Sequence, residues 1–350
     1  MAKGMYSLKD VAQAASVSVP TVSRILRRKN IARFSEDTCN RVWEAATRLR
    51  YRPNMLVKGM QTGLSHTVGV MVPPFDSYWS SILYGIHDAL ILADYVPIIL
   101  WVQHRDHHAG TKSVDGLEQV HRLLDRRIDG AILWPPVTPD YYDHHEEFAS
   151  RDVPVVTIDH ELPPKCGADS VTMDEELGAR LVAHHLVQLG HRRVAHLGEI
   201  DLHTYSWSHL RCKYFEQEMA KVPGVSCITN HRVKDADGVE IAKKILTDQS
   251  HPTAVYAASD MLARYVYLAA AELKMRIPQD VSVVGFADLD FAPLMGPPLT
   301  TVRQDGYEVG CSAAELLLSR LQGKFAACKS QNIKMNCELI VRGSTSPPSW

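Results

Sequence analysis

The chain has 350 residues, of which 45% are hydrophobic and 22% charged, and its formal net charge is −2. These values are typical of a globular protein large enough for two or three domains and exclude a disordered or fibrous chain. No uncharged apolar run is long enough to span a bilayer, and no signal-peptide core is present, so we expect no membrane association and a cytoplasmic location. The seven cysteines are dispersed, which favours reduced thiols over a disulfide framework.

The charge is unevenly distributed along the chain. Residues 1–63 contain 12 Lys/Arg and 4 Asp/Glu, a net charge of +8, whereas the rest carries 26 basic and 36 acidic side chains, a net charge of −10. A small basic segment on an acidic body is the pattern expected when only that segment meets a polyanion. A basic face that meets only solvent is the alternative interpretation.

Three helices are predicted in this basic segment. Ser7 and Asp10 have capping-box spacing and begin the first helix. Ser18 is the expected cap of the second helix, with Pro20 in its first turn, where the missing N–H costs little. About three residues separate the two helices, which is helix-turn-helix spacing. Ser35, followed by two acidic residues, begins the third helix.

The second helix exposes small side chains and one arginine. Small side chains near a helix N-terminus allow close approach to a major groove. Arg24 is able to pair bidentately with guanine, Thr21 and Ser23 to reach phosphate, and Val19 and Pro20 to contact a thymine methyl group. A three-helix bundle that binds a protein is the alternative.

A very short helix is predicted after the third. Pro53 ends the preceding helix and Asn54 is able to cap a new one that runs to about Met60. Because a helix of this length is unstable alone in water, we expect it to order only against a partner.

At this point the sequence resembles the LacI family of bacterial transcription regulators. The matching residues are Leu8-Lys9-Asp10-Val11-Ala12, Val17-Ser18…Thr21-Val22-Ser23-Arg24 and Tyr51-x-Pro53-Asn54. The resemblance implies that the short helix is a hinge whose two copies pair in a widened minor groove, with Met60 as the wedge. Gly59 weakens that helix, and Ser16 stands where the family turn usually has Gly or Asn, which predicts strain there. The DNA-binding residues expected are Leu8, Ser18, Val19, Pro20, Thr21, Ser23, Arg24, Arg27, Tyr51, Asn54, Val57 and Met60.

After residue 63, strand-like runs alternate with helical patterns. The alternation predicts parallel sheets with helices on both faces and a ligand site at the carboxyl ends of the strands. The expected strands are 66–72, 96–100, 129–134, 153–159, 193–198, 253–258 and 281–286, and one expected helix is 82–92.

The family resemblance extends over almost the whole chain. It is carried by Asp174-x-x-x-Gly178-Ala179, by His185-Leu186-x-x-Leu189-Gly190-His191-Arg192 and by Pro297-Pro298-Leu299-Thr300-Thr301. The implied fold class is an all-α helix-turn-helix head plus an α/β body of two doubly wound parallel-sheet subdomains, the type I periplasmic-binding-protein architecture, crossed three times by the chain. The domains expected are a head at 1–52, a hinge at 53–63 and an effector-binding and dimerisation core at 64–350, with an N-subdomain at about 64–162 and 299–327 and a C-subdomain at about 163–298 and 328–350.

The resemblance also implies positions for the effector. In the family, aromatic residues follow the first strand, and an arginine in the first helix of the second subdomain clamps ligand oxygens. Ser259 and Ala287 stand where the family often has Asn and Asp. The aspartates are equally interpretable as strand ends and helix caps. The effector-binding residues expected are Tyr78, Trp79, Trp134, Asp159, Arg211, Ser259 and Asp288.

Other kinds of site find no support in the sequence. The 17 histidines lack HExxH or any cysteine at ligand spacing, and GxGxxG, Walker A and GxSxG motifs are missing. We therefore expect no metal, no cofactor and no enzymatic activity, and the tail has no heptads for a tetramerising coiled coil.

Taken together, these features predict a cytoplasmic, homodimeric DNA-binding regulator, a repressor whose operator affinity depends on a sugar or related metabolite. A cytoplasmic carbohydrate-binding or transport protein without a DNA role, and a degenerate enzyme on the same body, remain open as alternatives.

Overall fold

The computed structural model describes residues 6–26, 31–52, 59, 63–73, 76–101, 116–134, 141–160, 168–198, 207–229, 237–323 and 330–349. The chain divides into two compact units, residues 1–65 and 66–350. We call them the head and the body and describe each by itself. Within the described residues, no helix has the length and apolar content required to cross a membrane.

The head is a small helical unit that confirms the predicted helices. Its helices are α1 (Leu8–Ala15), α2 (Val19–Leu26), the short 3-10 helix η1 (Ile31–Arg33) and α3 (Glu36–Arg48). Ser7 and Asp10 form the expected capping box, and Ser35 accepts from the N–H of Thr38. The buried side chains on the inner faces of the three α-helices make one apolar core, composed of Val11, Ala12, Ala15, Val22, Ile25, Cys39, Val42, Ala45 and Ala46.

The turn between α1 and α2 depends on one unusual backbone conformation. Ser16 has a φ of 54°, in the left-handed region, and its N–H bonds to the carbonyls of Ala12 and Gln13. That region costs a residue with a side chain about 1–2 kcal/mol relative to glycine. The strain predicted at Ser16 is therefore confirmed.

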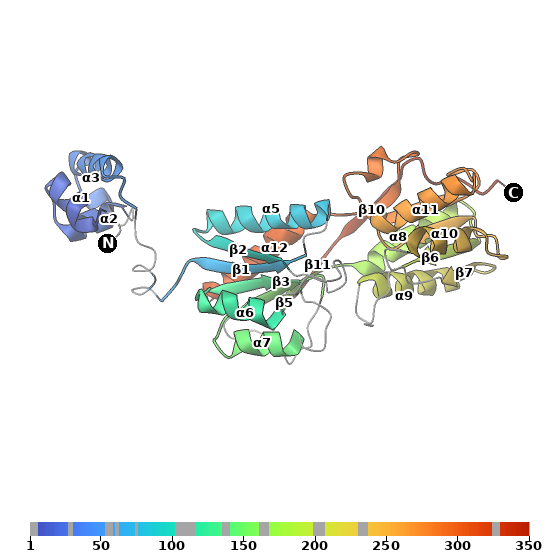
Figure 1. Ribbon diagram of the computed structural model, residues 1–350, viewed down its shortest axis with the longest axis horizontal. Helices are drawn as coiled ribbons and strands as arrows, with labels where there is room; N and C mark the ends of the chain where they lie inside the picture. The colour runs from blue at the N-terminus through green and yellow to red at the C-terminus, as the bar shows by residue number, and fades with distance from the viewer. Residues whose placement is uncertain are drawn as a thin grey trace. The chain divides into compact units, whose positions relative to one another are not determined.

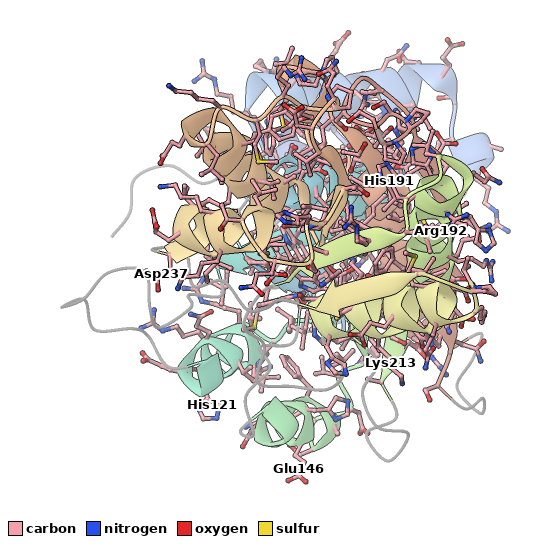
Figure 2. All side chains as sticks on the ribbon, turned by 90° about the vertical axis from the view of Figure 1, so that its right-hand side faces the viewer. His121, Glu146, His191, Arg192, Lys213 and Asp237 are labelled. Atoms are coloured by element: carbon pink, nitrogen blue, oxygen red, sulfur yellow. The ribbon has the colours of Figure 1, made fainter. Side chains whose placement is uncertain are left out.

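The first sheet of the body is entirely parallel and has the order β11-β5-β4-β3-β1-β2. Helices α5 and α12 pack together on one face, and α6 and α7, marked by His121 and Glu146 in Figure 2, lie side by side on the other (Figures 1 and 2). The strands are β1 (Thr67–Val72), β2 (Val96–Trp101), β3 (Gly130–Leu133), β4 (Val155–Ile158), β5 (Asp169–Met173) and β11 (Asn332–Met335), and the helices are α5 (Ser77–Leu92), α6 (Gly116–Asp125), α7 (Tyr141–Ala149) and α12 (Gly306–Leu321).

The second sheet has the order β12-β10-β9-β8-β6-β7 and is parallel except for the β10–β12 pair. Successive residues of β8 and β9 alternate between two apolar clusters, one under α10 and α11 and one under α8 and α9. The strands are β6 (Arg193–Leu197), β7 (Ser226–Thr229), β8 (Ala254–Ala257), β9 (Ser282–Ala287), β10 (Thr300–Gln304) and β12 (Cys337–Ile340), and the helices are α8 (Glu175–Gln188), α9 (Trp207–Ala220), α10 (Gly238–Leu246), α11 (Asp260–Glu272) and η4 (Ala292–Leu294).

The three crossings between the sheets occur later in the chain than the sequence predicted. β5 belongs to the first sheet, β10 to the second, and β11 to the first again, so the boundaries at 162/163, 298/299 and 327/328 each fall one strand too early. The reason is hydrogen bonding: β5 completes a parallel ladder with β4, and β10 one with β9, before the chain leaves each sheet. Figure 1 shows β10 and β11 running between the two subdomains.

Two glycines bring α5 and α12 into close contact. A Cβ atom on Gly85 would lie 2.1 Å from the carbonyl oxygen of Tyr307, and one on Gly310 would lie 2.1 Å from that of Ile82. The missing side chains therefore fix how closely the helices approach, and through α5 they fix the position of Tyr78 and Trp79 in its first turn.

Candidate functional site

The head presents α2 as a surface helix with few large side chains. Pro20 and Arg24 are exposed, whereas Val22 and Ile25 are fully buried against the other helices. The hydroxyl of Ser18 accepts from the N–H of Thr21, at 3.3 Å, which confirms the predicted cap. The helix has no acidic residue in its first turn, so its N-terminus keeps its partial positive charge for an outside anion.

The other residues predicted to contact DNA divide into two groups, apart from Ser23, which is half-buried on α2. Leu8, Val19 and Tyr51 are half-buried and pack against the core of the head, so each has a structural role. Arg27, Asn54, Val57 and Met60 lie outside the described residues, as does most of the predicted hinge helix.

In the body, Tyr78 and Asp159 meet where α5 begins and β4 ends. Asp76 caps α5 by accepting from the N–H of Trp79, at 3.2 Å, and the Tyr78 hydroxyl donates to Asp159 Oδ1 at 3.1 Å. Asp159 directly follows β4 and has a φ of 64°. Burial, reinforced by the negative charge of Glu175, raises the pKa of Asp159 to about 7, and burial also raises the pKa of Tyr78.

Aromatic rings surround this hydroxyl–carboxyl pair. The Trp79 ring meets that of Tyr78 at 5.6 Å and that of Trp134 at 6.0 Å, both edge to face, and Trp134 meets His160 at 6.0 Å in the same way. Edge-to-face packing at these distances is the favoured geometry of aromatic pairs. His160, which follows Asp159 in the sequence, was not among the predicted residues.

Arg211 approaches from the second subdomain. It lies on α9, the second helix of that subdomain and not the first as predicted, because the chain enters the subdomain through α8. Its guanidinium makes two hydrogen bonds to Glu175, at 2.6 and 2.9 Å, and one to the carbonyl of Ala258, at 2.7 Å. It also lies 3.6 Å from the centroid of the Phe286 ring.

Glu175, like His160, is a residue of this site that the sequence analysis did not predict. It follows Asp174, the N-cap of α8, and an acidic residue in a first turn is ordinarily explained by the helix dipole. The signal that could have found it is its place just after a strand, but residues 169–173, which form β5, were not among the predicted strands.

Ser259 and Asp288 are used as structural groups. The Ser259 hydroxyl accepts from the N–H of Leu262 and caps α11, and the nearly buried Asp288 carboxylate pairs with Arg303 at 2.8 Å and with Arg342 at 2.6 Å. The contacts of Asp288 support the structural alternative given for the aspartates, and Ser259, predicted to bind the effector, is instead a helix cap. The structure thus brings together Tyr78, Trp79, Trp134, Asp159 and Arg211 of the predicted set, which together with Glu175 and His160 we call the inter-subdomain cluster.

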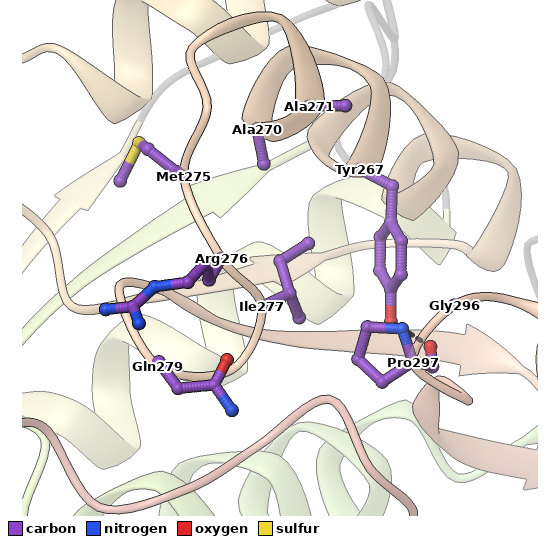
Figure 3. Close-up of a pocket in the computed structure, with 9 residues that line it drawn as sticks. All are labelled: Tyr267, Ala270, Ala271, Met275, Arg276, Ile277, Gln279, Gly296 and Pro297. Atoms are coloured by element: carbon purple, nitrogen blue, oxygen red, sulfur yellow. Dashed lines mark hydrogen bonds between the residues drawn. The ribbon is translucent and has the colours of Figure 1, made fainter.

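A surface hollow of about 340 Å³ lies elsewhere in the second subdomain (Figure 3). It is lined by Tyr267, Met275 and Arg276 at the C-terminal end of α11, and Tyr267 donates to the Pro297 carbonyl at 2.8 Å. Because Arg211 binds the carbonyl of Ala258, which lies just before the opposite end of this 13-residue helix, the hollow does not belong to the inter-subdomain cluster.

Comparison with known proteins connects both units to one family. Residues 7–54 match the family model described as bacterial regulatory proteins, lacI family, and residues 183–345 match a periplasmic binding protein-like domain. The chain is 29% identical over 344 residues to the HTH-type transcriptional repressor CytR of Escherichia coli K12, covering 97% of this chain and 96% of the relative. It is 26% identical over 347 residues to the repressor PurR of Haemophilus influenzae Rd, covering 97% and 98%.

Solved structures agree with these relatives. The lac repressor dimer bound to operator and the anti-inducer ONPF superimposes with a TM-score of 0.80 at 26% identity, covering 98% of this chain and 99% of that one. A LacI family transcriptional regulator from Enterococcus faecium with bound ribose gives a TM-score of 0.67 at 26% identity, covering 80% and 99%. With its helix-turn-helix head and its body of two parallel sheets, this chain is similar over nearly its whole length to regulators of the lacI family.

Proposed function

We propose that the chain is a homodimeric transcriptional repressor that acts in the cytoplasm, reads operator DNA with α2 and responds to a small molecule held at the inter-subdomain cluster. The observation that carries the proposal is the presence of both parts in one chain: an exposed Pro20–Arg24 helix face in a head of net charge +8, and a buried polar cluster built from both subdomains of the body.

The contents of the cluster favour an effector with a ring and hydroxyl groups. Trp79 and Trp134 offer apolar faces against which a sugar or nucleoside ring packs, and the Asp159 carboxylate accepts hydrogen bonds from hydroxyls. The related regulator from Enterococcus faecium with bound ribose supports this class of ligand.

The cluster residues come from both subdomains, so an effector bound there would act on the relative orientation of the subdomains. Tyr78 and Asp159 come from the first subdomain, and Glu175 and Arg211 from the second. A ligand that contacts both groups stabilises one relative orientation of the subdomains, and that orientation favours or disfavours DNA binding through the predicted hinge. Linkage requires that DNA change the ligand affinity by the same factor.

The test has two parts, both on the intact chain. Fluorescence anisotropy with DNA from upstream of the chain's own gene should show sequence-selective binding that weakens steeply with salt. A thermal-shift screen of sugars, polyols and nucleosides should identify the effector, because a ligand at 100 times its Kd adds about 2.7 kcal/mol to the free energy of unfolding. Ligand binding without selective DNA binding would instead support the carbohydrate-binding alternative.

A further inference from the structure

The Glu175 carboxylate pairs with the guanidinium of Arg211. Both side chains are buried, with exposed fractions of 5% for Arg211 and 10% for Glu175, and the two oxygens of one carboxylate bind Nε and Nη2 of one guanidinium. A paired, two-point contact of this kind is geometrically specific and neutralises the cation locally.

A second carboxylate, that of Asp159, also acts on Arg211. Asp159 feels the charges of Glu175, Arg211 and Asp76, and the negative charges of Glu175 and Asp76 both raise its pKa. One arginine therefore faces two carboxylates, those of Glu175 and Asp159, and an anionic ligand entering here would lose its hydration without gaining an unpaired cation.

Arg211 nevertheless keeps donors for a neutral oxygen. A guanidinium has five N–H groups, and among the described residues three are committed, two to Glu175 and one to Ala258. The other two remain for a hydroxyl or ether oxygen, and Asp159 is available to accept from a ligand hydroxyl. We propose that Glu175 is the specificity-determining residue for effector charge, so that the cluster accepts an uncharged polyhydroxyl ring compound and rejects its phosphorylated or carboxylated form. This assignment rests on the proposed function of the cluster as the effector site.

The experiment compares ligands that differ only in charge, by calorimetric titration of the intact wild-type chain. The pairs are D-ribose and ribose 5-phosphate, D-glucose and glucose 6-phosphate, and cytidine and cytidine 5′-monophosphate. For the pair that binds, we expect the uncharged member to bind at least about tenfold more tightly, which is about 1.4 kcal/mol. Equal or tighter binding of the phosphate by wild type would overturn the charge assignment while leaving the effector site in place.

Glu175→Gln removes the neutralising carboxylate and keeps the shape of the side chain. The unpaired Arg211 cation should then favour the phosphate, shifting the preference of wild type toward the anion by about tenfold or more. Glu338→Gln is the matched control, because Glu338 pairs with Arg303 at 3.0 Å on the surface. This variant should show the same preference between uncharged and phosphorylated ligand as wild type.

The outcomes separate the two proposals. A preference unchanged in Glu175→Gln, in protein that still binds operator, would overturn the role of Glu175. If no member of any pair binds to wild type, both the charge assignment and the effector class of the proposed function are wrong. Because the wild-type titrations need no variant, the assignment remains falsifiable even if Glu175→Gln does not fold.

Discussion

Arg320 of α12 donates two hydrogen bonds to the carboxylate of Asp169, each at 2.7 Å, and so joins the last helix of the first subdomain to the start of β5. The Asp169 carboxylate also accepts from the N–H of Gln331, which precedes β11, at 2.7 Å. One nearly fully buried carboxylate therefore connects three segments that are up to 162 residues apart.

Replacing Asp169 with alanine should destabilise the body strongly. The substitution leaves the largely buried Arg320 cation with one carboxylate fewer, and breaking a buried ion pair from one side costs about 3–5 kcal/mol. Urea unfolding followed by circular dichroism measures the loss. Asp37→Ala, which removes an exposed partner of Arg41, is the control and should cost less than about 1 kcal/mol. Similar losses for the two variants would contradict the role given to Asp169.

Gly310→Ala should push α5 and α12 apart. The added methyl group would lie 2.1 Å from the Ile82 carbonyl, which is backbone and has little room to move. Overpacking of this kind costs about 1–3 kcal/mol, and the shift of α5 should also displace Tyr78 and weaken effector binding. Unfolding and ligand titration measure the two effects, with the exposed Glu315→Ala on the same helix as control. A variant as stable as this control would mean that the helices separate without cost.

Asp159 should make the body less stable as the pH rises, whereas a carboxylate whose pKa is lowered by folding makes a protein more stable as the pH rises. Burial raises its pKa from 3.8 to about 7, so between these values the folded chain holds a proton that the unfolded chain has lost. The free energy of unfolding contributed by this group therefore falls as the pH rises through that range. Asp159→Asn should remove this contribution, and its stability relative to wild type should increase with pH.

The comparison with Asp159→Asn is needed because His191 makes the free energy of unfolding rise with pH, opposite to the effect of Asp159. Burial lowers the pKa of His191 to about 4, so the unfolded chain binds the extra proton up to about 6.5 and this group stabilises the fold as the pH rises. Unfolding curves of both proteins across the range isolate the Asp159 contribution. Parallel stability profiles for variant and wild type would rule out a raised pKa at Asp159.

Arg24→Ala should weaken operator binding by about 1–3 kcal/mol and relax the base preference at one position of each half-site. The reason is that Arg24 is exposed on α2 and is able to pair bidentately with guanine. Anisotropy with operator and random duplexes measures both effects. Arg48→Ala, an exposed arginine at the end of α3, removes the same charge and is the control. Equal weakening on operator and random DNA would show that Arg24 contacts only phosphate.

The sequence by itself determined the local elements. Ser7, Ser18 and Ser35 were correctly predicted as helix caps, because capping depends on side chains within three residues of the helix start. The predicted strands of the body were confirmed for the same reason, since apolar runs and their helical intervals are encoded in consecutive residues. Within the inter-subdomain cluster, Trp134 and Asp159 were predicted from their places at strand ends, and Tyr78, Trp79 and Arg211 from the family resemblance.

Tertiary structure alone decided which of these groups meet. Glu175 and Arg211 are 36 positions apart and lie on different helices, so their pairing depends on how α8 and α9 pack on the second sheet. Packing likewise turned Asp288 toward Arg303 and Arg342, and strand pairing kept β5, β10 and β11 in the sheet that precedes each crossing, so each crossing comes one strand later than expected. Local patterns specify a helix or strand and its buried face. Ion pairs and sheet order are instead fixed by contacts between distant segments, and these contacts stabilise the protein only when the whole core has assembled.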